Sequence, residues 1–567
     1  MHKPIRLFLL IASLLVLAAC AGGNRPYPMR WFYLNSLLES DAAVDSVGKV
    51  VRLAAEHGLN GMLMFSKFDY ISLQDDTWKA RLVRVKQICD NAGVELVPRC
   101  LDMGYNDETI LHHDPNLAEG LPVKDAIFEV QGGEAHLVPD PEGVIVNGSF
   151  ELYGRDLPEA FEPSDPGYVG SVLFVDKGQA SDGQVSLRVE IPRELPEETA
   201  LLSTRVPVKP RRCYRLSCMV RSTEIRDGGD VFPLMVRSVD GHRLNYQIPK
   251  LQTDGEWFRV DLGFNSLDRD SVVISVTAPA VSGTFWVDDL HLEEVALVNV
   301  LRRSGAPLVV RGEDGTVFEE GVDFAPVADS GLDFSFSHPG ARIVITSGSR
   351  IREGQRLLVS FYHGTTIYHH QVVACMSEPE VYEIWAEQVC QINALIAPKK
   401  YFLSVDELRM AGSCNACRER GLTPAQLVTD CVKRQVEIVR AVNPRAELLI
   451  WSDMFDPYHN ADRRDRYYLA SGDFYGSWES LPRDLIVACW HHGRRQQSLG
   501  HFTGLGFRTL ACGYYDAKNL QRDRTWLEAL NETPGAQGIM YTTWSNNYSL
   551  LSEFGDMVSA WPAKAGR

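Results

Sequence analysis

The fold can be inferred from one ten-residue stretch, Lys400-Tyr401-Phe402-Leu403-Ser404-Val405-Asp406-Glu407-Leu408-Arg409. Its first half is almost continuously apolar, which is typical of a parallel strand buried on both faces. The apolar run ends on two adjacent carboxylates, and functional side chains of α/β proteins stand at the carboxyl ends of such strands. Taken alone, the stretch fits catalysis as well as it fits an Asp that caps a helix beside a Glu paired with Arg409. The rest of the chain favours catalysis.

Strand and helix patterns alternate on both sides of this stretch. The alternation implies right-handed βαβ units and a parallel sheet. Three strands before a long interruption and five after it make eight, so the sequence predicts an α/β fold, a TIM (β/α)8 barrel with a large all-β insertion after strand three. We expect strands at 30–35, 60–65, 93–100, 402–407, 447–453, 484–490, 507–516 and 536–544, and helices at 42–57, 78–92, 378–396 and 423–441.

The interruption has the pattern of antiparallel β structure. Short alternating strands with frequent Gly, Asp and Pro fill residues 142–294, which indicates a β-sandwich. A smaller β-rich piece follows. We therefore expect five parts: a signal peptide at 1–20, the first part of the barrel at 27–140, the sandwich at 141–295, a small β-rich module at 296–365 and the second part of the barrel at 366–567.

Three segments of the sandwich, at 146–151, 182–189 and 286–292, look like the opening, middle and closing strands of jelly-roll carbohydrate-binding modules. In such modules, early acidic residues and the closing Asp often hold a structural calcium ion. The resemblance implies that Glu151 and Asp289 occupy those positions. The alternative is a sandwich that is purely architectural and binds nothing.

The N-terminus has the features of a secretory signal. Lys3 and Arg6 precede a short apolar run, which is too short for a comfortable membrane span. Leu17-Ala18-Ala19-Cys20 resembles a bacterial lipobox, in which the Cys is acylated. This implies an exported protein of the bacterial cell envelope, tethered to the membrane only through the lipid on Cys20. An ordinary signal peptide with an incidental Cys is the alternative.

The charge balance limits the partners. The chain has 567 residues, 45% of them hydrophobic, and a formal net charge of −17. Nucleic-acid binding draws its affinity from Lys and Arg that neutralise phosphates, so the charge argues against that partner. A neutral substrate such as a sugar is compatible with it.

The twelve cysteines include one CxxC pair, Cys414 and Cys417. A tetrahedral zinc site needs four ligands, and no second pair stands at a matching spacing. The pattern therefore favours a local disulfide or free thiols over a zinc site.

Polar and aromatic side chains gather at the predicted ends of the later strands. Aromatic faces stack on the C–H faces of sugar rings while carboxylates bind hydroxyls, so this set predicts a carbohydrate site. A buried aromatic cap on the barrel is the alternative. The residues are Asp406-Glu407, Trp451 with Asp453, Trp490-His491-His492, Tyr514-Tyr515-Asp516, and Trp544.

An adjacent Asp-Glu pair, with no Glu at the end of strand seven, suits substrate-assisted cleavage of a glycoside. Glu407 would protonate the leaving oxygen, Asp406 would orient the 2-acetamido group of the substrate as the nucleophile, and a Tyr would steady the cyclic intermediate. Glu407 must then hold a proton before the attack, which a Trp-lined pocket and the charge of Asp406 favour. This chemistry requires no cofactor.

Several barrel segments resemble glycoside hydrolase family 20, the β-N-acetylhexosaminidases. They are 374–382 with Asp406-Glu407, 94–98 on strand three, 514–516 on strand seven and 538–544 on strand eight. The resemblance implies that Asp406 orients the acetamido group, Glu407 is the acid/base, Tyr514 stabilises the intermediate and Asp516 contacts the acetamido group. It also implies that Trp451, Trp490 and Trp544 wall the pocket, and we place Asp453 and Asn546 among the substrate-binding residues.

The chain departs from the family pattern at groups that hold the sugar. Phe402-Leu403-Ser404-Val405 replaces His-x-Gly-Gly, the strand-one Arg is absent from 31–35, and Trp544-Ser545-Asn546 replaces Trp-x-Glu. The reaction class is therefore better supported than the sugar. Two alternatives stay open: a non-catalytic glycan-binding lipoprotein on the same fold, and a retaining hydrolase with Asp453 or Asp516 as nucleophile.

Overall fold

The computed structural model describes residues 27–104, 110–155, 157–191, 195–196, 199–223, 234–247, 255–278, 282–367, 371–463 and 469–561. Cys20, the predicted lipidation site, and the signal peptide lie outside these ranges. Within them, no helix is both long enough and apolar enough to cross a bilayer.

Eight parallel strands close into a barrel in the order in which they occur along the chain, so the predicted TIM barrel is confirmed. β27 pairs with β1 to close the ring, and β21 pairs with β3 although the whole β insertion separates them in sequence. The barrel strands are β1 (Met29–Asn35), β2 (Gly61–Phe65), β3 (Glu95–Cys100), β21 (Lys400–Leu403), β23 (Glu447–Trp451), β25 (Ile486–Cys489), β26 (Arg508–Tyr514) and β27 (Ala536–Thr542).

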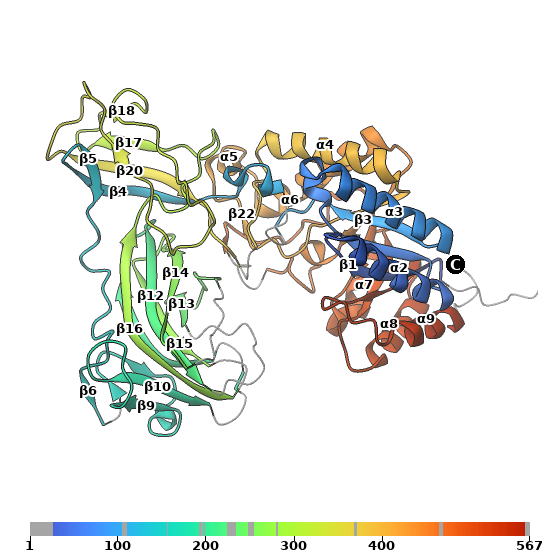
Figure 1. Cartoon of the computed structure of the whole chain (residues 1–567), viewed down its shortest axis with the longest axis horizontal. Coiled ribbons are helices and arrows are strands. Elements are labelled where there is room, and N and C mark those ends of the chain that lie inside the picture. The colour runs from blue at the N-terminus through green and yellow to red at the C-terminus, as the bar shows by residue number, and fades with distance from the viewer. Residues whose placement is uncertain are drawn as a thin grey trace, which may run out of the picture.

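Helices cover the outside of the barrel (Figure 1). Their ends follow local rules: Thr423 and Gln426 form a capping box at the start of α6, and Gly93 ends α3 with a left-handed φ of 69°. The α-helices are α2 (Asp41–Glu56), α3 (Asp76–Ala92), α4 (Pro379–Ile396), α5 (Asn415–Glu419), α6 (Pro424–Val442), α7 (Arg495–Gly504), α8 (Gln521–Asn531) and α9 (Leu551–Ala560). The 3-10 helices are η1 (Phe68–Leu73), η2 (Ile110–His112), η3 (Pro115–Leu117), η4 (Pro166–Tyr168), η5 (Asp453–Phe455) and η6 (His492–Arg494).

Two apolar layers stabilise the barrel. One fills its interior and the other lies between the strands and the helices, because successive residues of a strand point to opposite faces. The interior layer includes Leu63, Val97, Phe402, Leu449, Ile486 and Leu510. The outer layer includes Val51, Leu82, Met64, Ile392, Val432 and Phe554.

After β3 the chain leaves the barrel and builds two β units, seen apart from the barrel in Figure 1. The first is a six-stranded sheet in the order β18-β17-β20-β4-β5-β19. Its strands are β4 (Leu121–Gln131), β5 (Glu134–Leu137), β17 (Val309–Gly312), β18 (Val317–Phe318), β19 (Ile343–Val344) and β20 (Arg356–His363).

The second β unit is the predicted sandwich, in which sheet β14-β12-β16-β10-β9 packs on sheet β13-β15-β11-β8 around one apolar core. Its strands are β8 (Glu162–Pro163), β9 (Leu173–Asp176), β10 (Ser186–Ile191), β11 (Ala200–Pro207), β12 (Cys213–Thr223), β13 (Leu234–Ser238), β14 (Phe258–Asn265), β15 (Ser271–Thr277) and β16 (Gly283–Val295). Two minor pairs are β6 (Tyr153–Gly154) with β7 (Leu157–Pro158) and β22 (Met410–Ala411) with β24 (Leu469–Ala470).

The domain boundaries need one correction. β4 and β5 were expected within the first part of the barrel, at 27–140, but β4 pairs with β20 and both strands belong to the six-stranded sheet. The small module therefore combines segments from both sides of the sandwich. The sandwich itself ends with β16 at Val295, at the predicted boundary.

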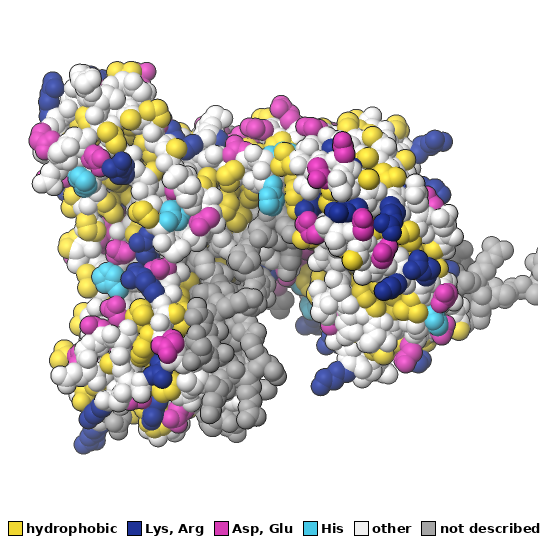
Figure 2. Space-filling model, in the orientation of Figure 1, with side chains coloured by type: hydrophobic (Ala, Val, Ile, Leu, Met, Phe, Trp, Pro, Cys, Tyr) yellow, Lys and Arg dark blue, Asp and Glu magenta, His cyan; other side chains and the backbone are white. Residues whose placement is uncertain are grey.

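Charges of both signs are interspersed over the barrel helices on the face shown in Figure 2. Arg81 and Arg84 of α3 pair with Asp41 and Asp45 of α2 across this surface. The described part of this face therefore offers a mixed surface of small ion pairs, unlike the continuous basic patch of a nucleic-acid-binding protein.

Candidate active site

A pocket opens at the carboxyl ends of the barrel strands. Its lining comes from the last residue of β23 and from the segments that follow β21, β25, β26 and β27. It consists of two carboxylates and four aromatic rings. The rings contact one another, with centroids 5.7 Å apart for Tyr515 and Trp544 and 6.0 Å apart for Trp490 and Tyr515. The lining residues are Asp406, Glu407, Trp451, Trp490, Tyr515 and Trp544. The fold thus brings together six side chains from the set that the sequence placed at the strand ends.

A short chain of hydrogen bonds that begins at Arg99 of β3 holds Asp406 in place. The Arg99 Nε donates to Ser404 Oγ at 2.7 Å, and Ser404 Oγ donates to Asp406 Oδ1 at 3.0 Å. Arg99 Nη2 lies 3.8 Å from the same oxygen. Burial raises the pKa of Asp406 above its usual value, against the opposing effect of the Arg99 charge. Both contacts use Oδ1, which leaves Oδ2 for a ligand.

Glu407 is half-buried and lies beside a cation. Its Oε2 accepts a hydrogen bond from Arg409 Nη2 at 2.7 Å, and Arg409 also donates to Gln371 Oε1. The backbone of Glu407 is left-handed, with φ of 45°, and its N–H donates to Asp453 Oδ2 at 2.8 Å. The ion pair favours the charged carboxylate, whereas an acid catalyst must begin its cycle protonated.

Asp453 supports the site from beneath and does not line the pocket. It is fully buried, and its oxygens accept hydrogen bonds from the Glu407 N–H, Asn460 Nδ2 and Trp490 Nε1. Burial and the negative charge of Asp406 raise its pKa. With these contacts Asp453 positions Glu407 and Trp490, so it is poorly placed to act as a nucleophile.

The tyrosine that reaches the pocket is Tyr515, and the assignment of this place to Tyr514 is corrected. Tyr514 is buried and stacks on Tyr541 at 4.0 Å in the layer between barrel and helices. The strand alternation that puts Leu510 and Cys512 inside would also put Tyr514 inside, but its φ of 68° breaks that alternation. The pKa of Tyr515 is raised by burial first, and the nearby charges of the site carboxylates add to this.

Asp516 and Asn546 hold loops instead of lining the pocket. Asp516 accepts hydrogen bonds from Thr543 Oγ1, Ser545 Oγ and the N–H groups of Trp544 and Ser545. Asn546 exchanges hydrogen bonds with the backbone of Asn35 at the end of β1. Both residues fix the loop that carries Trp544, so the acetamido contact expected of Asp516 is not supported by its geometry.

Trp451 has a free donor in this region. Its side chain is buried. The centroid of its ring lies 4.6 Å from that of Phe402 and 6.4 Å from that of Trp544. Its indole N–H has no acceptor among the described residues. A buried donor without a partner is costly, which makes it a candidate to bind an oxygen of a ligand.

The sequence did not single out Arg99 and Tyr33. Arg99 is a charged residue inside the apolar run of β3, and that interruption is the signal that could have revealed it. Tyr33 on β1 lies near Arg99 and Asp406, and burial raises its pKa to about 12. Arg409 pairs with Glu407, as the non-catalytic interpretation of this stretch predicts.

The two predicted calcium residues have different surroundings. Glu151 Oε1 accepts the N–H groups of Gln184 and Val185, and Asp289 is exposed. The neighbouring Asp288 is buried and accepts the N–H groups of Ser181 and Asp182. These carboxylates order the 181–185 loop. A calcium ion at Glu151 and Asp289 stays a prediction.

The CxxC pair is not an isolated feature. Cys414 and Cys417 lie against Cys375 and Glu119, and all four side chains are buried. The sequence has no second pair at a matching spacing, but the fold brings Glu119 and Cys375 from other parts of the chain to this place. None of its four residues lines the pocket.

No protein-family model and no curated protein sequence matches this chain. Solved structures match parts of it. The CBM22-1 xylan-binding domain of Paenibacillus barcinonensis Xyn10C has 16% identity and a TM-score of 0.20, over 26% of this chain and 91% of that chain.

Two other matches are glycosidases. An inactive mutant of a family 20 exo-β-N-acetylglucosaminidase from Vibrio harveyi has 15% identity and a TM-score of 0.24, over 35% of this chain and 33% of that chain. A β-N-acetylhexosaminidase has 10% identity and a TM-score of 0.24, over 34% of this chain and 44% of that chain. The assignment of the fold rests on the strand order of the barrel, not on these partial likenesses.

Proposed function

We propose that the chain is a glycoside hydrolase that acts on glycans containing N-acetylhexosamine or a related sugar. One observation carries this proposal: two adjacent carboxylates open into a pocket walled by three Trp rings and one Tyr ring at the carboxyl ends of the barrel. Aromatic faces suit the C–H faces of a sugar ring, and carboxylates suit its polar substituents.

The two carboxylates differ in the way that substrate-assisted cleavage requires. Asp406 is buried and presents Oδ2, which would accept the N–H of a 2-acetamido group and turn the acetamido oxygen toward the anomeric carbon. That oxygen would form the new bond to the anomeric carbon as the leaving oxygen takes a proton from Glu407. Water would then attack the anomeric carbon of the cyclic intermediate and give a proton back to Glu407. The Tyr515 hydroxyl would steady the intermediate.

The ion pair between Arg409 and Glu407 favours a second candidate, a glycan-binding protein without turnover. A guanidinium 2.7 Å from Glu407 stabilises its charged form and holds it away from acid catalysis. For a hydrolase, the substrate must displace Arg409 or neutralise its effect. The two candidates make opposite predictions for a single substitution.

Glu407→Gln separates the candidates. The wild-type chain and the variant would be assayed on aryl glycosides with and without a 2-acetamido group, and sugar binding would be followed by calorimetry. We expect the wild type to hydrolyse the acetamido substrates and the variant to lose roughly 10²–10⁴-fold in kcat, the usual range for one acid/base group. Binding of the sugar should persist, because Gln keeps the shape of Glu.

Glu383→Gln on the exposed face of α4 is the matched control, and its rates should equal those of the wild type. No turnover of any glycoside by the wild type, with sugar binding retained, would support the binding protein and overturn the hydrolase. We further propose that export and a lipid on Cys20 place the protein on the bacterial cell envelope.

A further inference from the structure

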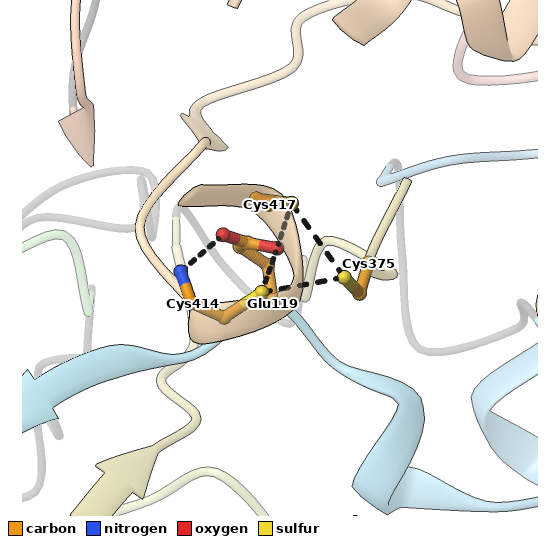
Figure 3. Close-up of side chains that lie close together, drawn as sticks. All are labelled: Glu119, Cys375, Cys414 and Cys417. Atoms are coloured by element: carbon orange, nitrogen blue, oxygen red, sulfur yellow. Dashed lines mark hydrogen bonds between the residues drawn. The ribbon is translucent and has the colours of Figure 1, made fainter. Parts of the chain in front are cut away.

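Four buried side chains with metal-binding atoms meet where the β insertion joins the barrel (Figure 3). Glu119 comes just before β4, where the chain leaves the barrel, and Cys375 comes just before α4, where it returns. Cys414 and Cys417 lie at the start of α5, in the loop that follows Glu407. The ligand atoms of all four lie within 4.8 Å of one another.

The spacing of these atoms fits a tetrahedral metal site. Cys375 Sγ lies 3.4 Å from Cys414 Sγ and 3.7 Å from Cys417 Sγ, and Glu119 Oε2 lies 3.3 Å from both Cys414 Sγ and Cys417 Sγ. With Zn–S bonds of about 2.3 Å and a Zn–O bond of about 2.0 Å, tetrahedral geometry separates two sulfurs by about 3.8 Å and a sulfur from an oxygen by about 3.5 Å. A small closure or expansion of the cluster therefore gives four normal bonds.

The surroundings hold Glu119 in the orientation that a ligand needs. Its Oε1 accepts the N–H groups of Ser413 and Cys414 at 2.7 and 2.9 Å, which directs Oε2 toward the sulfurs. Arg303 Nη2 donates to the Ala118 carbonyl at 2.9 Å, one residue before Glu119. Ligands fixed by such outer contacts are typical of metal sites.

The burial of these groups also calls for a cation. A carboxylate and three thiolates are costly to bury as charges unless cations compensate them. Arg303 is one neighbouring cation, and it also pairs with Glu378. Thiolate ligands select zinc over the hard cations calcium and magnesium. Four protein ligands close the coordination shell, which is the arrangement of a structural site, not a catalytic one.

We propose that Glu119, Cys375, Cys414 and Cys417 together bind one zinc ion, which fastens both junctions of the β insertion to the loop after β21. The site is independent of glycoside hydrolysis. It joins three segments of the chain, with Glu119 lying 295 residues before Cys414 and Cys375 lying 39 residues before it. Its loss would therefore loosen the junctions between the insertion and the barrel.

The metal content of the purified full chain tests the proposal. The chain would be isolated without a metal-affinity step or a chelator, and its metals measured by inductively coupled plasma mass spectrometry. We expect about one zinc per chain, as for a closed four-ligand site. Cys375→Ser, Cys417→Ser and Glu119→Gln should each lose most of it, whereas Cys390→Ser, an exposed cysteine on α4, should retain it.

A second measurement avoids variants that fail to fold. Zinc would be removed from the folded wild type by a chelator under reducing conditions and replaced by Co²⁺. We expect the absorption bands of tetrahedral cobalt thiolate, their loss on adding zinc, and a lower Tm for the metal-free chain. A disulfide between two of the three cysteines in the freshly isolated chain would overturn the proposal, as would three titratable thiols with no cobalt thiolate bands.

Discussion

Three consecutive residues with left-handed backbone, Tyr514, Tyr515 and Asp516, determine which tyrosine faces the pocket. Their φ angles are 68°, 54° and 53°, a conformation that side chains other than Gly rarely adopt. Such strain is commonly found at functional sites, where the surrounding structure compensates for its cost. It turns Tyr514 into the outer layer and Tyr515 toward Asp406 and Glu407.

Tyr515→Phe should therefore affect catalysis, whereas Tyr514→Phe should not. Removing the Tyr515 hydroxyl takes away the donor that we propose for the cyclic intermediate. We expect kcat to fall roughly 10²-fold, as for loss of one preorganised donor. For Tyr514→Phe we expect kcat to stay within about threefold, with any effect confined to stability. Steady-state kinetics of both variants on an aryl 2-acetamido glycoside provide the measurement. The opposite ranking would restore the role of Tyr514.

The sequence identified the pocket residues at the level of strand ends but not of single side chains. Asp406, Glu407, Trp451, Trp490 and Trp544 were found because an apolar run precedes each group. The positions of Tyr514 and Tyr515 could not be distinguished, because a left-handed turn leaves no pattern when the residues are not Gly or Asn. The interactions of Arg99 depend on the pairing of β3 with β21, which no local signal reveals.

Helix α8 carries a buried acid, Asp523, which lies beside Gly513 of β26. Asp523 is fully buried, and burial raises its pKa to about 7, from an ordinary value of 3.8. Between about pH 4 and pH 7 the folded state keeps a proton that the unfolded chain has lost. The contribution of this group to stability is therefore highest below about pH 4 and falls as the pH rises through about 7.

Asp523→Asn should stabilise the protein at pH 8 and have little effect at pH 4. Asp523 carries a buried charge only above its folded-state pKa, and Asn removes that charge. The gain in the free energy of unfolding is at most about 4 kcal/mol. Urea denaturation of both chains at the two pH values gives the free energies of unfolding. Asp76→Asn, exposed at the start of α3, should show no such pH dependence. An equal effect of Asp523→Asn at both pH values would contradict the buried charge.

At the scale of elements, the sequence predicted all eight barrel strands and the sandwich, because alternation and apolar runs are local signals. β4 and β5 were assigned to the wrong unit. They alternate like strands of any antiparallel sheet, and only their pairing with β20, more than two hundred residues away, shows that they belong to the small module. β21 also ends at Leu403, so Asp406 and Glu407 lie on the following loop, whose geometry depends on Asp453 and Arg409.

In the whole molecule, the β insertion interrupts the barrel between β3 and β21, beside the proposed active site. β3 and β21 flank the insertion and pair directly, so Arg99 from before the insertion supports Asp406 from after it. The zinc site proposed here joins the same two parts of the chain through Glu119, Cys375 and the CxxC pair. Neither arrangement could be predicted from spacing, because each requires the closed barrel before its members become neighbours.

The central claim is that Asp406 and Glu407 direct an attack by the acetamido group of the substrate itself. The most direct test is the rate of hydrolysis of aryl 2-acetamido glycosides whose acetyl group carries one, two or three fluorines. Fluorine withdraws electrons from the carbonyl oxygen, so the account predicts that kcat/KM falls with each fluorine, by roughly 10²-fold or more over the series. A rate that is independent of fluorination, or equal to that of the 2-hydroxy glycoside, would contradict it.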